Sequence, residues 1–423
     1  MNELYNLYLQ FPHICTDTRN ITQGCLFFCL KGDNFDGNTF ALQALAAGAA
    51  RVVTEDKMLA AHEHCIVVDD VLHTLQALAI YHRQQLRIPV IGITGTNGKT
   101  TTKELIMTVL SKKFHVTCTQ GNFNNHIGVP LTLLSINADT EIAIVEMGAN
   151  HVGEIADLCH IAQPTHGLIT NIGRAHLEGF GSIENIITTK RAIYEFLIRH
   201  ESIIFINDED EILRKCVGKY RQLVKYGNTP DSTCQGTVTA LNPYLGVQID
   251  DVQFDTQLTG EYNLINILCA VAVGLHFGVT LPIAAQAIAD YQPQNNRSQL
   301  DLQGSNVVIA DYYNANPSSM HAALINLVHL PDSHKIAILG DMLELGEVSD
   351  EEHQKVIDFC LQNKIQALFV GETFARIGKQ EAQTFETIAE LNDYLSQNPI
   401  QNSTILIKGS RGIHLEKIVL PQK

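Results

Sequence analysis

The sequence is poor in basic residues for its length. Its 423 residues include 29 Lys and Arg against 45 Asp and Glu, which gives a formal net charge of -16. Residues 226–296 contain no Lys or Arg, although they contain six acids. Because nucleic-acid binding takes most of its affinity from Lys and Arg that neutralise phosphates, this balance argues against nucleic acid as a main partner.

Signatures of disordered, secreted and membrane proteins are also missing. With 45% hydrophobic and 17% charged residues, the composition is that of a globular chain. Residues 1–10 carry one acid and no basic cluster, unlike a secretory signal peptide. Residues 262–289 lack charge, but Asn, Gly and Pro residues divide them, which predicts two buried helices and no membrane insertion.

The cysteines show no pattern of disulfides or of a zinc site. The ten are scattered along the chain, and none forms a Cys-x-x-Cys pair. Reduced, mostly buried thiols are typical of proteins in a reducing compartment. We therefore expect a cytoplasmic protein.

Strand and helix patterns alternate along almost the whole chain, which predicts an α/β fold with largely parallel sheets. A proline-containing break over 86–89 and a polar stretch over 291–296 divide the chain. We expect three domains, over residues 1–86, 87–296 and 297–423. In the last domain, four apolar runs separated by helical patterns predict the strands of a small doubly wound sheet, over 307–310, 335–339, 367–370 and 404–407.

The strongest local motif is a glycine-rich loop between a hydrophobic strand and a helix. It comprises Gly95, Thr96, Asn97, Gly98, Lys99, Thr100 and Thr101. Such a loop directs backbone N–H groups and a helix N-terminus toward a polyphosphate. Lys99 would add a cation for the β- and γ-phosphates, and Thr100 a hydroxyl for Mg²⁺.

Two further polar residues follow predicted strands of the same domain. Glu146 ends an apolar run that begins at residue 141, and His176 follows a run that ends at Thr170. Ligands of parallel sheets bind at the carboxyl ends of the strands. Glu146 and His176 are therefore candidate Mg²⁺ ligands, while a surface glutamate and a packing histidine are the simpler alternatives.

These motifs resemble the ATP-dependent Mur ligases of bacterial cell-wall synthesis. The resemblance rests on the loop over 95–100, on Glu146-Met147-Gly148-Ala149-Asn150 and on the stretch 175–181, and it covers nearly the whole chain. The stretches 121–130, 311–317, 339–346 and 408–411 are similar to the family member that adds D-alanyl-D-alanine to UDP-N-acetylmuramoyl-tripeptide. The resemblance implies a UDP-sugar-binding N-terminal domain, a central ATPase domain, and a Rossmann-like C-terminal domain for the amino substrate.

The resemblance also implies a mechanism and its residues. In the family, ATP phosphorylates a carboxylate, and an amine then displaces the phosphate from the acyl phosphate. Bringing two anions together needs cations placed beforehand. The catalytic residues implied are Lys99, Glu146, His176, Lys190 and Arg297, with Mg²⁺ held by Thr100, Glu146, His176 and, if carbamylated, Lys190. From the sequence alone, Lys190 is a solvated helix lysine.

Substrate contacts are assigned in the same way. For ATP they are the loop residues 95–101 together with Asn263, Asn266, Arg297 and Asp311, and Tyr262 stands where the family has a histidine. For the nucleotide sugar they are Thr18, Arg19, Lys31 and Asn125. For the amino substrate they are Tyr313, Asn314, Asn316, Lys408, Ser410 and Arg411.

Three other classes of protein share part of these motifs or bind nucleotides in a similar loop. Another Mur ligase that adds a single amino acid, or a folylpolyglutamate synthase, would share the phosphate loop. A GTPase switch would need an Asn-Lys-x-Asp motif, and residues 363–366 read Asn-Lys-Ile-Gln. The sequence does not specify whether the tripeptide ends in lysine or diaminopimelate, and we expect a monomer.

Overall fold

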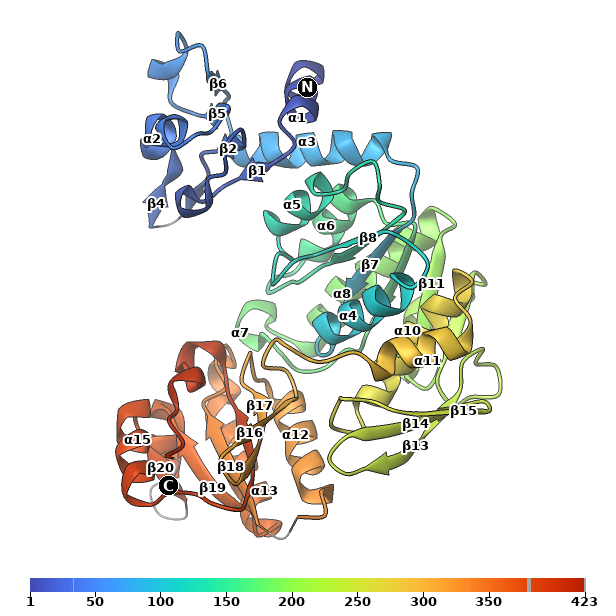
Figure 1. Ribbon diagram of the computed structural model, residues 1–423, viewed down its shortest axis with the longest axis vertical. Helices are drawn as coiled ribbons and strands as arrows, with labels where there is room; N and C mark the ends of the chain where they lie inside the picture. Colours follow the sequence, from blue (N-terminus) through green and yellow to red (C-terminus); the bar gives the residue numbers. More distant parts are fainter. Residues whose placement is uncertain (33, 333, 379–381, 422–423) are drawn as a thin grey trace.

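The computed structural model describes residues 1–32, 34–332, 334–378 and 382–421. Strands and helices alternate along the described chain and form five sheets, which confirms the α/β class. In Figure 1 the chain runs from an N-terminal sheet (blue), through a central sheet (green), to a C-terminal sheet (orange) at the other end of the molecule.

The N-terminal sheet is small and wholly parallel. Its strand order is β1-β2-β5-β6, and its core consists of small and sulfur-containing side chains around Phe27. Its elements are β1 (Ile14–Cys15), β2 (Leu26–Phe28), β5 (Arg51–Thr54), β6 (Cys65–Val67), the hairpin strands β3 (Lys31–Gly32) and β4 (Phe35–Asp36), α2 (Ala41–Ala46), and the 3-10 helices η1 (Thr18–Asn20), η2 (Gly37–Phe40) and η3 (Lys57–Leu59).

Helices α1 (Asn2–Gln10) and α3 (Val71–Gln85) pack on the central region. Figure 1 shows α3 crossing between the N-terminal sheet and helices α5 and α6. The buried Arg83 side chain donates to the carbonyls of Ala162 (3.0 Å) and Gln163 (2.9 Å) at the end of α6. These bonds satisfy a buried guanidinium and fix α3 to the central region.

The central sheet is six-stranded and parallel, in the order β12-β11-β10-β7-β9-β8. Strands β7 and β9 are buried at every position because helices cover both faces. The strands are β7 (Val90–Thr94), β8 (Val116–Cys118), β9 (Ile142–Glu146), β10 (His166–Ile169), β11 (Ile203–Asn207) and β12 (Leu223–Tyr226).

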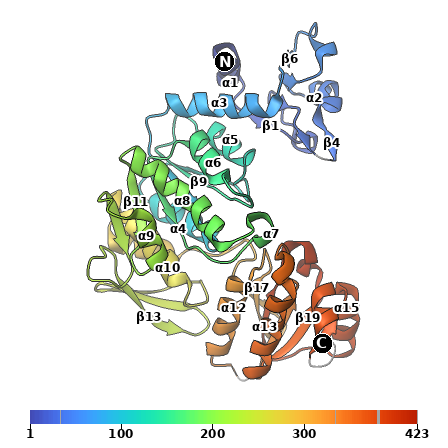
Figure 2. The same ribbon diagram turned by 180° about the vertical axis from the view of Figure 1, so that it is seen from behind.

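Two helical layers cover the central sheet, as the views from front and back show (Figures 1 and 2). One hydrophobic core joins the sheet to α4 (Lys99–Leu110), α10 (Asn263–His276) and α11 (Leu281–Ala289). The other joins it to α5 (Gly128–Leu134), α6 (Glu154–Ala162), α8 (Ile183–Arg199) and α9 (Glu211–Val217). The uncharged segment 262–289 thus forms two helices, as predicted, and no helix of the described residues is long and apolar enough to cross a membrane.

An antiparallel sheet of three strands was not foreseen from the sequence. It consists of β13 (Gly236–Leu241), β14 (Leu245–Ile249) and β15 (Val252–Asp255), and it packs against α10 and α11. The segment that lacks Lys and Arg therefore supplies this sheet and two helices, α10 and α11, of one helical layer of the central region.

Within the described residues, the C-terminal sheet has six strands in the order β16-β17-β21-β18-β19-β20, and only β16 is antiparallel to its neighbour. The four predicted strands correspond to β17 (Asn306–Asp311), β18 (Lys335–Gly340), β19 (Gln366–Val370) and β21 (Thr404–Lys408), whereas β16 (Gln299–Gln303) and β20 (Gln383–Phe385) were not predicted. Its helices are α12 (Pro317–His329), α13 (Ser349–Gln362), α14 (Glu372–Ile377), α15 (Ile388–Gln397), η4 (Gly346–Val348), η5 (Arg411–Ile413) and η6 (Leu415–Lys417).

Candidate active site

A cavity of about 760 Å³ lies between the central and C-terminal sheets. It lies at the carboxyl ends of strands from both sheets, where open parallel sheets bind ligands. Beside the phosphate loop, each region contributes six predicted site residues. Those of the central region are Asn125, Glu146, His176, Lys190, Asn263 and Asn266, and those of the C-terminal region are Arg297, Asp311, Tyr313, Asn314, Asn316 and Lys408. The fold thus brings together residues that are up to three hundred positions apart in the chain.

The phosphate loop is held in place by the end of the neighbouring strand β10. Gly95 has a φ of 148°, and a Cβ there would lie 1.9 Å from the Thr170 hydroxyl, so only glycine fits. Thr170 and Asn171 donate to the carbonyl of Asn97, at 2.6 and 3.0 Å. Helix α4 starts at Lys99, directly after Gly98, with its N-terminus toward the cavity. The loop has the geometry that cradles a polyphosphate.

Two lysines converge on the backbone of this loop. The Lys99 ammonium donates to the carbonyls of Gly95 (2.8 Å) and Thr96 (3.1 Å), and the Lys190 ammonium donates to the same Gly95 carbonyl (3.0 Å). Among the described residues, neither lysine has an acidic partner within 4 Å. Burial lowers the pKa of Lys99, and burial together with the nearby Lys99 charge places the pKa of Lys190 well below its ordinary value.

The structure corrects one prediction from the sequence alone. Lys190 is only 3% exposed and does not lie on a solvated helix surface. It lies on the same face of α8 as the buried Ile186, Ile193 and Leu197, because residues three and four apart share one face of a helix.

Glu146 ends strand β9 inside the cavity and is 1% exposed. Its Oε1 accepts from the Asn124 amide (2.9 Å) and from the Thr100 hydroxyl (3.3 Å). Its Oε2 is buried without a hydrogen-bond partner among the described residues, and the Lys103 ammonium lies 4.0 Å away. An unsatisfied carboxylate oxygen beside a threonine hydroxyl fits a hard cation with oxygen ligands, such as Mg²⁺.

His176 lines the cavity but contacts the C-terminal region. It adopts a left-handed backbone conformation (φ 51°), and its Nδ1 pairs with the carboxylate of Glu344. The neighbouring Arg174 lies 3.5 Å from the buried Glu352 carboxylate. The segment that carries His176 therefore joins the two regions, and its role as a metal ligand stays a prediction.

The predicted adenine-site residues form a buried network at the start of α10. The Asn266 amide donates to Asn263 Oδ1 (2.9 Å), and its Oδ1 accepts from the Thr102 hydroxyl of α4 (3.1 Å). Asn263 donates to the carbonyl of Thr259 (2.8 Å). Both asparagines line the cavity, yet most of their polar atoms already bind protein, so they also position α10 against the phosphate-loop helix.

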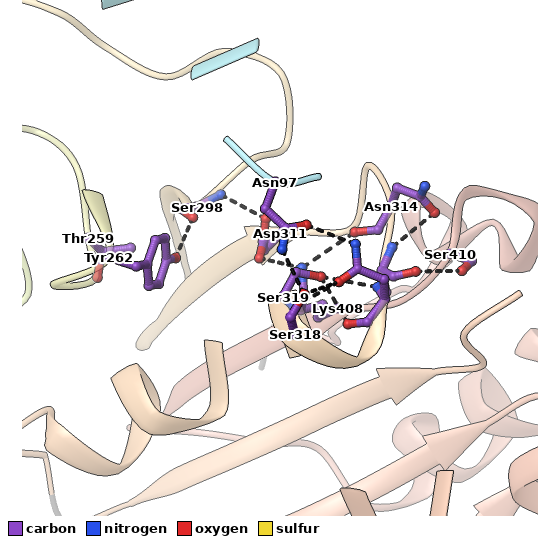
Figure 3. Close-up of polar contacts among 12 residues, drawn as sticks. Asn97, Thr259, Tyr262, Ser298, Asp311, Asn314, Ser318, Ser319, Lys408 and Ser410 are labelled. Carbon is purple, nitrogen blue, oxygen red and sulfur yellow. Dashed lines mark hydrogen bonds and ion pairs between the residues drawn. The ribbon is translucent and has the colours of Figure 1, made fainter. Parts of the chain in front are cut away.

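Tyr262 occupies the place where the family has histidine. Its hydroxyl shares a hydrogen bond of 2.7 Å with the Ser298 hydroxyl, and burial raises its pKa. The Ser298 N–H donates to the Asp311 carboxylate (3.2 Å), as Figure 3 shows. Tyr262 thus connects the central region to the first residues of the C-terminal region.

On the C-terminal side, Asp311 and Lys408 form a pair of 2.7 Å in which the lysine side chain is 3% exposed. Tyr313 lies between two arginines, with the guanidinium carbon of Arg297 3.8 Å and that of Arg411 5.6 Å from its ring centroid. Such distances fit cation–π contacts. Ser410 is buried, accepts from the N–H of Leu343 (2.9 Å) and donates to the carbonyl of Ala315 (3.3 Å).

The predicted nucleotide-sugar residues are not all brought to the cavity. Asn125 lines it, and its Oδ1 accepts from the backbone N–H groups of Ile127 and Gly128 at the start of α5. Thr18, Arg19 and Lys31 lie in the N-terminal region outside it, where Arg19 pairs with Asp17 (2.6 Å) and Lys31 pairs with Glu55 (2.8 Å).

Sequence reasoning did not select Lys103, Asn124, Asn171, Ser298 and Glu344, all of which contact predicted site residues. Asn171 directly follows a predicted strand, and this position could have marked it. No sequence signal marks Lys103, whose ammonium is buried and donates to the Thr119 carbonyl (2.8 Å).

Comparison with known proteins agrees with this geometry. The chain matches the Mur ligase family, catalytic domain over residues 10–91, the Mur ligase middle domain over 93–274, and the Mur ligase, glutamate ligase domain over 296–411. The chain belongs to the Mur ligase family. The resemblance inferred from the motifs is thereby confirmed.

Relatives within the Mur ligases extend over nearly the whole chain. A Bacillus subtilis protein named UDP-N-acetylmuramoyl-tripeptide--D-alanyl-D-alanine ligase is 36% identical, with 96% of this chain and 92% of the relative covered. An Escherichia coli protein of the same name is 32% identical, with 99% and 95% covered. A crystal structure of MurF from Acinetobacter baumannii matches with a TM-score of 0.85 and 31% identity, over 96% of this chain and 91% of that one. The crystal structure of MurF ligase from Thermotoga maritima in complex with ADP matches with a TM-score of 0.82 and 27% identity, over 96% of both chains.

Proposed function

We propose that this Mur ligase joins D-alanyl-D-alanine to UDP-N-acetylmuramoyl-tripeptide, with ATP converted to ADP and phosphate. The relatives that carry this name are more than 30% identical over nearly the full chain. The observation that carries the proposal is that the phosphate loop, Glu146 and the arginine-flanked Tyr313 all line the same cavity. A phosphoryl donor, a carboxylate and an amine can meet there.

The first step transfers the γ-phosphoryl group of ATP to the tripeptide carboxylate. The loop N–H groups and the N-terminus of α4 would bind the phosphates, and Lys99 would leave its carbonyl partners to neutralise them. Thr100 and Glu146 would hold Mg²⁺, which when bound supplies positive charge to the transferring group. Arg297 lies on the opposite wall, with a buried Nε that has no partner among the described residues, and would add a second cation there.

Lys190 is the best-supported site of a carbamate. Its amine is buried, and burial lowers its pKa, which favours the neutral form that attacks CO₂. The carbamate would place an anion beside the Lys99 ammonium, where a protonated Lys190 would repel it. An anionic group at this position would add an oxygen ligand to the proposed Mg²⁺ site.

The second step forms the amide bond. The dipeptide amine attacks the acyl carbon, loses a proton and expels phosphate with its bonding electron pair. Arg411 is exposed and its guanidinium lies near the ring of Tyr313, which lines the cavity, so Arg411 is a cation that could receive the dipeptide carboxylate. Lys408, which we also expected in this role, is already neutralised by Asp311 and would act by holding that wall in place.

Related activities have less support. The solved UDP-N-acetylmuramoyl-L-alanyl-D-glutamate--2,6-diaminopimelate ligase is 16% identical, and a Mycobacterium tuberculosis folylpolyglutamate synthase is 15% identical. These likenesses show the fold alone. We further propose that the enzyme is a monomer in the bacterial cytoplasm, which size-exclusion chromatography with light scattering and cell fractionation would test.

The direct test is phosphate release by the purified protein. We expect release from ATP with Mg²⁺ only when UDP-N-acetylmuramoyl-tripeptide and D-alanyl-D-alanine are both present. Tripeptides ending in lysine and in diaminopimelate should be compared in parallel. Release with single amino acids in place of the dipeptide would contradict the proposal.

A further inference from the structure

The phosphate loop is joined to the C-terminal region by a closed ring of three side-chain hydrogen bonds. Asn97 Nδ2 donates to Ser318 Oγ (2.8 Å), Ser318 Oγ donates to Asn316 Oδ1 (2.9 Å), and Asn316 Nδ2 donates to Asn97 Oδ1 (2.8 Å). Within the ring, each residue donates one bond and accepts one. Figure 3 shows Asn97 and Ser318 within one cluster of polar contacts, and Ser318 belongs to the first turn of α12.

Both ends of the ring are fixed independently of it. The Asn97 N–H donates to the Asn171 side chain (3.0 Å), and the Asn97 carbonyl accepts from Thr170 and Asn171, so the loop backbone at this residue is anchored to β10. Asn316 is the N-cap of α12, where its Oδ1 accepts from the Ser319 N–H (2.9 Å). Asn97 and Asn316 are therefore each held by other bonds. The ring forms only when the central and C-terminal regions bring these two residues within hydrogen-bond distance.

The ring also lies between two parts of the cavity with different tasks. Asn97 belongs to the loop that would hold the phosphates, and Asn316 and Ser318 adjoin Asn314 and Tyr313 on the amino-substrate wall. A movement of Asn97 would thus also move Asn316 and Ser318 on the amino-substrate wall, because two hydrogen bonds join Asn97 to them.

We propose that Asn97, Asn316 and Ser318 form a latch through which an occupied phosphate loop positions the amino-substrate wall. Asn97 and Ser318 are positioning residues in this proposal, because they act through α12. The kinetic part of the proposal rests on the proposed function.

The first experiment uses hydrogen–deuterium exchange and does not depend on ligase activity. In the parent protein, saturating ADP should slow amide exchange over residues 314–322, about fivefold for a segment tied by two hydrogen bonds. In the Asn97→Ala variant at saturating ADP this protection should be lost, while protection of the loop segment 95–101 remains. Parent-like protection of residues 314–322 in Asn97→Ala would show that the latch does not exist.

The second experiment is kinetic. Ser318→Ala should raise the KM for D-alanyl-D-alanine about fivefold, with the KM for ATP changed less than about twofold. Ser318→Thr keeps the hydroxyl and should behave like the parent, and Ser396→Ala changes an exposed serine of α15 as a matched control. Equal increases in both KM values would point to damage of the loop and overturn the proposal.

A double variant completes the test. Because the ring is broken when either side chain is removed, the double variant Asn97→Ala with Ser318→Ala should raise the KM for D-alanyl-D-alanine no further than Asn97→Ala alone. If the fold increases in KM of the two single variants multiplied in the double variant, the two residues would act separately. A parent protein that makes no product would refute the proposed function, and the exchange experiment would still decide whether the latch exists.

Discussion

The two walls of the cavity hold their charges in different ways. On the central wall, Lys99 and Lys190 contact backbone carbonyls, and Glu146 keeps one buried oxygen without a hydrogen bond. On the C-terminal wall, Lys408 is paired with Asp311 at 2.7 Å. Lys99, Lys190 and Glu146 of the first wall have charge available for a ligand, whereas the charge of Lys408 in the second wall is neutralised within the protein.

This difference separates residues for chemistry from residues for structure. A buried ion with no counter-ion costs free energy unless a ligand supplies the opposite charge. We infer that the central wall binds phosphates and cation, and that the buried pair of the C-terminal wall keeps the strand ends of β17 and β21 in place. Variants on the central wall should then lose activity, and variants of the pair should lose stability.

The largest effect is expected at Lys190. Lys190→Ala should reduce turnover by roughly 10³-fold, because it removes the group that carries the proposed carbamate. A short-chain carboxylic acid should restore part of the activity by occupying the vacated space with an anion. Steady-state phosphate release measures both results, and Lys215→Ala, at an exposed lysine paired with Glu211, is the control. Parent-level turnover without added acid would contradict the role of Lys190.

A smaller effect is expected at Glu146. Glu146→Gln keeps the shape and the bonds to Asn124 and Thr100 but removes the negative charge, so turnover should fall about 10²-fold and half-saturation should need more Mg²⁺. Activity measured across a Mg²⁺ titration, ending with EDTA, tests this. The exposed Glu211→Gln serves as the control. An unchanged Mg²⁺ requirement would place the cation elsewhere.

For the buried pair of Asp311 and Lys408, substitutions should lower stability more than turnover. Asp311→Asn leaves the buried Lys408 ammonium without a counter-ion and should lower the free energy of unfolding by about 3 kcal/mol. Replacing both residues, by Asp311→Asn with Lys408→Met, should recover much of that loss because no buried charge remains. Urea unfolding followed by circular dichroism measures the series. If Asp311→Asn changed activity alone, at full stability, the distinction between the two walls would be wrong.

The phosphate loop and Glu146 could be predicted because their signals are local. The glycines, Lys99 and Thr100 follow one strand within a few residues, and Glu146 ends another apolar run. The parallel order of the strands then places both at the same edge of the sheet. The same reasoning located the four inner strands of the C-terminal sheet and the two uncharged helices.

Other features could not be predicted because they depend on contacts between distant segments. The small strands β13 to β15 become stable by packing on α10 and α11, and their sequence has weak alternation. The burial of Lys190 depends on which face of α8 meets the sheet. The pairing of Asp311 with Lys408 joins the last residues of two neighbouring strands, β17 and β21, which are almost one hundred positions apart in the chain.

By itself, the sequence determined the class of fold, the phosphate loop, the carboxylate at the end of β9 and the family. These follow from short-range spacing and from the preferences of strands, helices and glycine turns. Only the tertiary structure decided that Lys190 is buried beside Lys99, that Lys408 is neutralised, and that Asn97 reaches the start of α12. The physical reason is that a side chain's charge state and hydrogen bonds depend on burial and on neighbours in space, which spacing along the chain does not fix.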